Sequence, residues 1–81
     1  MNILTFKEIL ALNIEEAEAY EIMLFDYWVF ESKHNDALIK YLGNVQALIS
    51  YMFGACVERT ENDIALLNKL AEEFEESYIE I

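Results

Sequence analysis

Proline is absent from this chain of 81 residues, and glycine occurs only twice, at Gly43 and Gly54. Proline and glycine are the strongest local breakers of helices and the commonest turn residues. Their scarcity argues against an all-β fold, which needs many turns, and predicts long helices. No repeat, linker or low-complexity segment interrupts the chain, so we expect a single helical domain over residues 1–81.

Cysteine occurs once, as Cys56, which excludes a disulfide within the chain. A lone cysteine in an apolar run behaves as a small buried side chain, and it fits a reducing compartment. The first ten residues, MNILTFKEIL, lack the basic stretch and apolar core of a secretory signal. These features predict a cytoplasmic protein.

Basic residues are few: 5 lysines and arginines face 16 aspartates and glutamates, for a net charge of −11. Such a chain repels phosphate backbones, so we expect no direct binding of nucleic acid. Anionic membrane surfaces are disfavoured for the same reason. Basic protein surfaces are the favoured partners. The alternative is that the acids only keep an apolar protein soluble.

Long hydrophobic runs are also missing, because a membrane-spanning helix needs about 20 apolar residues. The two longest apolar stretches are IMLFDYWVF at 22–30 and ALISYMFGACV at 47–57. Both end at charged or polar residues before that length, so no membrane association is expected. Hydrophobic residues still make up 56% of the chain, which is too apolar for intrinsic disorder.

Two reciprocal capping patterns mark helix starts in the first third of the chain, since each joins a cap residue to a glutamate three positions later. These pairs are Thr5 with Glu8 and Asn13 with Glu16. The first predicts a short helix to about residue 12, and the second a helix over about 14–33. Asn13 is a weak breaker, so the two could also form one helix. The inward stripe of the second helix is Ala17, Tyr20, Leu24 and Tyr27 or Trp28.

Polar breaks at 32–36 and 58–63 bound two further helices, and either Thr60 with Asp63 or Asn62 caps the last one. Each carries an apolar stripe at alternating steps of three and four residues. In the helix predicted over 36–58, the stripe is Leu38, Leu42, Val45, Ile49, Met52 and Cys56. In the last helix it is Ile64, Leu67, Ala71, Phe74, Tyr78 and Ile81.

The fold predicted from these patterns is all-α, a small antiparallel bundle of three main helices with a short additional helix at the N-terminus. The two central helices are apolar on more than one side, so we expect the runs 22–30 and 47–57 to pack on each other and on a second chain. A twofold dimer is the commonest way to bury leftover apolar surface. The predicted apolar interface consists of Phe25, Trp28, Leu48 and Tyr51.

The last helix ends in an acidic segment that opposes its own helix dipole. Its carboxylates predict a docking face for a basic partner, with a merely solvated face as the alternative. The residues of this acidic docking face are Glu72, Glu73, Glu76 and Glu80.

One sequence motif is compatible with metal binding, because Glu31 and His34 are spaced as the Glu-x-x-His pairs of di-iron bundles. A single copy at a helix end indicates a solvated terminus instead, so no metal, cofactor or catalytic residue is predicted. We expect no enzymatic activity.

The function class that these observations favour is a small acidic protein-interaction module. Its concrete form is an inhibitor or antagonist that occupies a basic, nucleic-acid-binding surface of a target protein. The first alternative is a structural homo-oligomeric bundle or assembly factor, and the second is a metal-binding bundle that uses Glu31 and His34.

Overall fold

The computed structural model describes residues 3–31 and 36–79, and within these ranges it contains helices and no strand. This confirms the predicted all-α class. The elements are α1 (Phe6–Leu10), α2 (Ile14–Glu31), α3 (Asp36–Ser50), the π-helical turn η1 (Tyr51–Ala55) and α4 (Glu61–Ile79).

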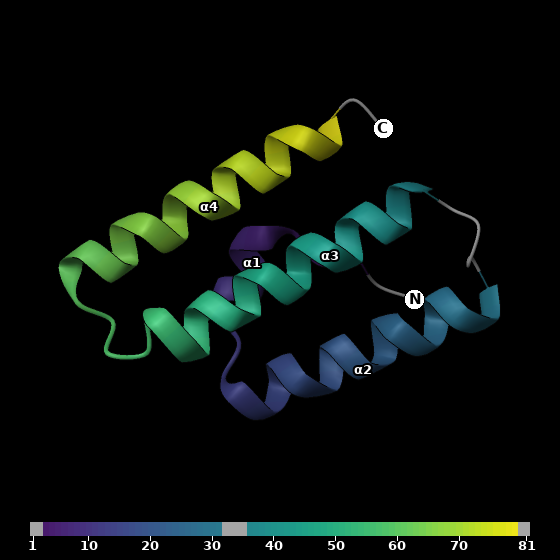
Figure 1. Ribbon diagram of the computed structural model, residues 1–81, viewed down its shortest axis with the longest axis horizontal. Coiled ribbons are helices and arrows are strands. Elements are labelled where there is room, and N and C mark those ends of the chain that lie inside the picture. Colours follow the sequence, from purple (N-terminus) through teal and green to yellow (C-terminus); the bar gives the residue numbers. More distant parts are fainter. Residues whose placement is uncertain (1–2, 32–35, 80–81) are drawn as a thin grey trace.

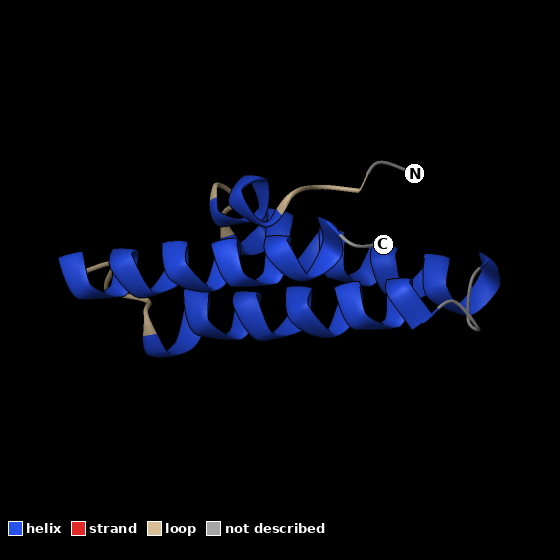
Figure 2. Ribbon diagram, turned by 90° about the horizontal axis from the view of Figure 1, so that it is seen from above, coloured by secondary structure: helices blue, strands red, loops and turns tan. Residues whose placement is uncertain are grey.

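The three long helices run antiparallel to their neighbours along the chain, as predicted for the bundle (Figure 1). Helix α3 lies between α2 and α4 and packs against both. The short helix α1 packs mainly against α4, on one side of the long helices (Figure 2). The molecule measures 38 × 28 × 18 Å, so α2 and α4 each remain open to solvent along much of their length.

Three helices begin at the reciprocal caps that the sequence predicts. In each pair the cap side chain accepts the backbone N–H of the third residue, at 2.8–3.1 Å, and the acidic side chain accepts the cap's own N–H, at 2.9–3.1 Å. The pairs are Thr5 with Glu8, Asn13 with Glu16 and Thr60 with Asp63. The hydrogen bond from the Thr5 backbone N–H, and then the one with its hydroxyl, lowers the pKa of Glu8. The cap at Asn13 therefore separates α1 from α2.

The helix predicted over 36–58 crosses Gly43 without a break, but it ends earlier than predicted. Its last turn is π-helical, closed by the Cys56 N–H donating to the Tyr51 carbonyl at 2.8 Å. Arg59 then adopts a left-handed backbone with φ 55° and stops the helix. The Arg59 guanidinium donates to the Met52 carbonyl at 3.3 Å and lies 5.7 Å from the centre of the Phe53 ring. The helix end is thus capped by a side chain that follows it.

The apolar stripes predicted for α2 and α3 form the core. All six stripe residues of α3 and η1 are buried, as are Ala17, Tyr20 and Leu24 of α2, while Tyr27 and Trp28 pack partly buried against them. On α4 the stripe is correct from Leu67 onward, but Ile64 is 48% exposed. Ile64 belongs to the first turn of α4, and the start of this helix extends past the end of η1 (Figure 1). Ile81 and the side chain of Tyr78 lie outside what the structure describes.

The short helix α1 closes one side of the core. Phe6 and Ile9 are fully buried although α1 has only five residues. The Phe6 ring lies 5.3 Å from the ring of Tyr41 and 5.5 Å from that of Phe74, centre to centre. Tilted aromatic contacts at such distances stabilise beyond the area they bury. An element predicted only as a short addition therefore joins α3 to α4.

A hydrogen-bonded circuit holds the segment before α1 in place. The Leu4 N–H donates to the Tyr20 hydroxyl at 2.9 Å, and the Tyr41 hydroxyl donates to the Leu4 carbonyl at 2.6 Å. The two hydroxyl oxygens are 2.7 Å apart. Since a tyrosine hydroxyl has one hydrogen and Tyr41 directs its own to Leu4, the Tyr20 hydroxyl donates to Tyr41. The circuit therefore has one consistent direction and joins three segments distant in sequence.

Removal of either hydroxyl should destabilise the fold, because each deletion leaves a buried partner without its hydrogen bond. We expect Tyr41→Phe and Tyr20→Phe each to lower the free energy of unfolding by about 1–2 kcal/mol. The double variant should lose less free energy of unfolding than the sum of the two single losses, since both hydroxyls belong to one circuit. Urea unfolding measures these values. The control is Tyr51→Phe, at an exposed tyrosine. If this control lost as much free energy of unfolding as Tyr20→Phe and Tyr41→Phe, the stabilising role of the circuit would be contradicted.

The two phenylalanines that meet between α1 and α4 should differ in their contributions. Phe6→Ala removes a fully buried ring, which costs about 3–5 kcal/mol. Phe74→Ala should cost less, about 2 kcal/mol, because part of the Phe74 ring is already exposed in the folded state. Urea midpoints compare the two, with Phe6→Leu as the milder variant if Phe6→Ala does not fold. Equal losses would mean that α1 is not part of the core.

Candidate interaction surfaces

Helix α2 is apolar on the side that faces away from the core as well as on the side that forms it. Phe30 is 81% exposed, Ile22 64% and Phe25 47%, and the nearby Met23 and Val29 are also exposed. We call this surface the α2 outer face; it consists of Ile22, Met23, Phe25, Asp26, Val29 and Phe30. Contiguous exposed apolar surface on a small protein usually marks a place of contact with another molecule.

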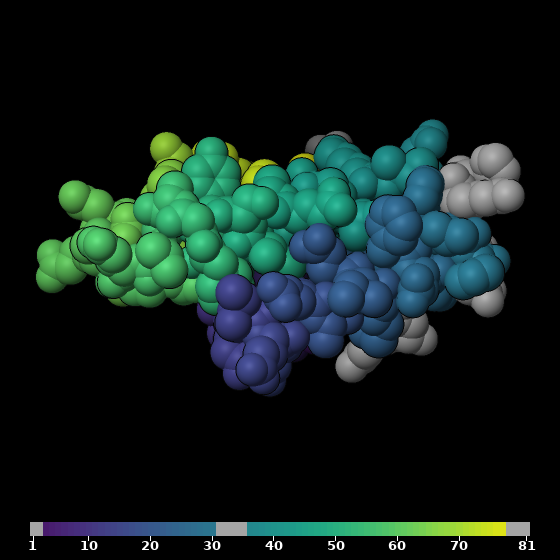
Figure 3. Space-filling model, turned by 60° about the horizontal axis from the view of Figure 1, so that its bottom comes forward, coloured from purple at the N-terminus to yellow at the C-terminus, as the bar shows by residue number. Residues whose placement is uncertain are grey.

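The outer face is open because α2 packs mainly against α3 and only along one side. The short helix α1 packs mainly against α4. Figure 3 looks from below onto α2, in blue, which lies at the surface along its length. The opposite, inward side of the same helix supplies Ala17, Tyr20 and Leu24 to the core.

A carboxylate lies within the α2 outer face. Asp26 is exposed between the turns that carry Ile22 and Phe30, and none of the described residues forms an ion pair with it. A shallow depression of about 160 Å³ is lined by Glu21, Ile22, Phe25 and Asp26. Its lining therefore combines two apolar and two acidic side chains. This combination suits a long cationic side chain, whose stem is apolar and whose head is charged.

Phe25 is held by Trp28, one turn further along α2. The two ring centres lie 5.5 Å apart at an angle of 56°. Trp28 is partly buried, and its indole Nε1–H is enclosed with no hydrogen-bond acceptor among the described residues. The contact fixes the Phe25 ring against the helix that bears it.

The four residues predicted as an apolar interface therefore fall into three different environments. Phe25 and Trp28 contact each other on α2, where Phe25 is exposed and Trp28 packs partly buried against the core. Leu48 is wrong, because it is fully buried in the chain's own core and faces inward on α3. Tyr51 is exposed, but it is the first residue of η1 and not part of α2.

The expectation that the runs 22–30 and 47–57 pack on each other is also wrong. Helices α2 and α3 run antiparallel (Figure 1). In this arrangement, residues at equal distances from the connection oppose each other, so 22–30 lies beside the first half of α3. The run 47–57 lies instead at the other end of the molecule, near the start of α2 and beside α4. The prediction from the sequence did not take this antiparallel alignment of α2 and α3 into account.

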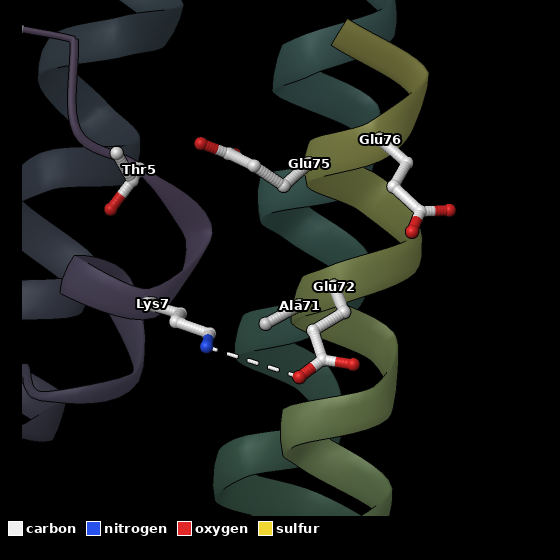
Figure 4. Close-up of a pocket in the computed structure, with 6 residues that line it drawn as sticks. All are labelled: Thr5, Lys7, Ala71, Glu72, Glu75 and Glu76. Atoms are coloured by element: carbon white, nitrogen blue, oxygen red, sulfur yellow. Dashed lines mark ion pairs between the residues drawn. The ribbon is translucent and has the colours of Figure 1, made fainter. Parts of the chain in front are cut away.

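The predicted acidic docking face borders a groove between α1 and α4. The groove encloses about 350 Å³ and is lined by Thr5, Lys7, Ala71, Glu72, Glu75 and Glu76 (Figure 4). Lys7 Nζ lies 3.9 Å from Glu72 Oε1, and both side chains are largely exposed, so this ion pair adds little stability. The Glu75 carboxylate accepts the Phe6 N–H at 3.4 Å.

The acidic residues predicted for docking are thus divided by their environment. Glu72 and Glu76 lie beside α1 in the groove, while the exposed Glu73 is not among its lining residues. Glu80 lies outside the described residues. Glu75, which the sequence reasoning did not single out, contributes to the groove because it lies one turn beyond Ala71 on the flank toward α1. The sequence alone does not show which side of α4 contacts α1, so Glu75 could be assigned to the groove only from the structure.

The possible metal ligands cannot be placed together. His34 and the side chain of Glu31 lie outside what the structure describes, and the described residues contain no cluster of three potential metal ligands. Cys56 is buried in the core, as predicted. Burial raises the pKa of its thiol, and the nearby Asp63 carboxylate raises it further.

Comparison with known proteins gives no relatives: no family model, no curated protein and no solved structure matches this chain. Among the described helices, none is both long and apolar enough to cross a membrane.

The Cys56 thiol should react slowly in the folded protein. Its raised pKa and its burial both lower the concentration of accessible thiolate, which is the reactive form. We expect labelling by a thiol reagent at pH 8 to be at least about tenfold slower than in urea-unfolded protein. Equal rates in the two states would show that η1 does not enclose the thiol.

Proposed function

We propose that this protein is a small acidic interaction module, without a catalytic role, that occupies a basic surface of a target protein. The observation that carries the proposal is the α2 outer face, where exposed apolar side chains surround Asp26. Apolar surface of this kind is buried favourably by a partner at about 25 cal/mol per Å². The protein's function is therefore to bind.

The charge of the chain determines what kind of partner is favoured. Helix α2 contains six carboxylate residues and no lysine or arginine, and the whole chain has a net charge of −11. Such a surface accelerates association with basic partners and repels acidic ones. Nucleic-acid-binding proteins carry basic surfaces, so the concrete form of the proposal is an inhibitor that competes with nucleic acid. The single free thiol fits a cytoplasmic setting.

A homo-oligomeric bundle is the second candidate, because a second copy could also cover the α2 outer face. Against it, pairing two copies of α2 brings carboxylates together with no cation on either helix. Light scattering decides between the two. A dimer that persists at high salt would support the homo-oligomer, whereas a 9.5 kDa monomer would support binding to a different protein.

The proposed function can be tested by affinity capture at two salt concentrations. Immobilised protein is incubated with a lysate of the source cells, and the bound proteins are identified. We expect basic proteins, released as the ionic strength rises from about 0.1 M to 1 M because the Debye length falls from about 10 Å to 3 Å. Purified partners should lose bound nucleic acid when this protein is added. Partners that are acidic, or that resist salt, would contradict the proposal.

A further inference from the structure

The exposed apolar residues of α2 follow a helical repeat. Ile22, Phe25 and Val29 are spaced by three and four residues and form a stripe along the axis of the helix. A stripe of this spacing is the surface on which a second helix packs. The described residues contain no strand, and therefore no sheet edge that an extended peptide could join.

The charges of this surface specify the partner further. The depression is lined by two apolar side chains, Ile22 and Phe25, and by two acidic ones, Glu21 and Asp26. The apolar stem of a lysine or arginine can lie against Ile22 and Phe25 while its charged head reaches the Asp26 carboxylate. Because none of the described residues forms an ion pair with Asp26, the partner would supply its counterion.

We propose that the α2 outer face binds an amphipathic helix of a partner protein, one that presents apolar side chains together with a lysine or arginine directed at Asp26. This inference rests on the proposed function and names the element that the partner contributes. A second copy of this chain is the less suitable occupant, because α2 contains no lysine or arginine to meet Asp26.

Trp28 provides a direct readout of this binding. It is the only tryptophan in the chain, and its ring contacts that of Phe25, a member of the outer face. A helix placed on Phe25 should therefore change the emission of Trp28. A probe peptide without aromatic residues leaves this signal free of interference.

The experiment uses three synthetic peptides, each about five turns long when helical. The first combines leucine and lysine in an amphipathic helical pattern, the second has the same composition in scrambled order, and the third replaces lysine by glutamate. We expect the first peptide to bind with a change in Trp28 emission. The scrambled peptide should bind at least about tenfold more weakly, since its leucines no longer share one face, and the glutamate peptide should not bind.

Two variants of the outer face are paired with controls of equal chemistry elsewhere. Phe25→Ser should weaken binding of the leucine–lysine peptide by more than about tenfold, because aromatic anchors dominate interface energetics. Its control is Ile64→Ser, at an apolar residue of similar exposure on α4. Asp26→Asn should weaken binding by about fivefold. Its control is Glu58→Gln, which changes the net charge equally at an exposed site beyond η1.

The outcomes separate this inference from the function on which it rests. If the first peptide binds and both outer-face variants bind as tightly as their controls, the helix docks elsewhere. The inference is then wrong, while the binding of basic partners stands. If no basic peptide binds and the captured proteins are not basic, both the inference and the proposed function are wrong. If the protein is a dimer that Phe25→Ser dissociates, a second copy occupies the face and the inference is overturned. Circular dichroism confirms that each variant is folded.

Discussion

The hydrogen-bonded circuit of Leu4, Tyr20 and Tyr41 is the interaction on which the arrangement of this bundle depends. It links the segment before α1 to α2 and α3 through two tyrosine hydroxyls and the backbone N–H and carbonyl of Leu4. With that segment fixed, Phe6 enters the core beside Tyr41 and Phe74. Polar groups inside a small core are tolerated when each has a partner, and here the partners come from three remote parts of the chain.

The position of α1 has a consequence on the far side of the molecule. A chain of this length has few elements with which to cover its helices, and α1 packs on α4. Helix α3 lies between α2 and α4, so α2 has a neighbour on one side only. The same packing that completes the core therefore leaves the α2 outer face without a covering helix.

Exposed apolar residues and a large negative charge act together on this protein. The net charge of −11 makes separate copies repel each other, while the apolar face provides favourable contact for a surface of suitable charge. Because Asp26 is part of the α2 outer face, this surface combines exposed apolar side chains with negative charge. A basic amphipathic partner meets both, because it supplies the missing cation and covers the apolar side chains.

Local features of the fold are determined by the sequence alone. The caps at Thr5, Asn13 and Thr60 form as predicted because their hydrogen bonds join residues three apart. The buried stripes of α2 and α3 follow from helical periodicity for the same reason. The sequence also shows that the run 22–30 of α2 is apolar on more than one side of the helix, which is the part of the candidate site that could be predicted.

Only the tertiary structure decides which apolar side of a helix is covered. Leu48 and Phe25 both lie outside the apolar stripes predicted to face the core. Leu48 is nevertheless fully buried and Phe25 is exposed, because α3 has helices on two sides and α2 on one. The antiparallel register likewise separates the runs 22–30 and 47–57, which composition alone would join. Contacts between distant segments depend on how many neighbours each helix has, and spacing along the chain carries no information about that number.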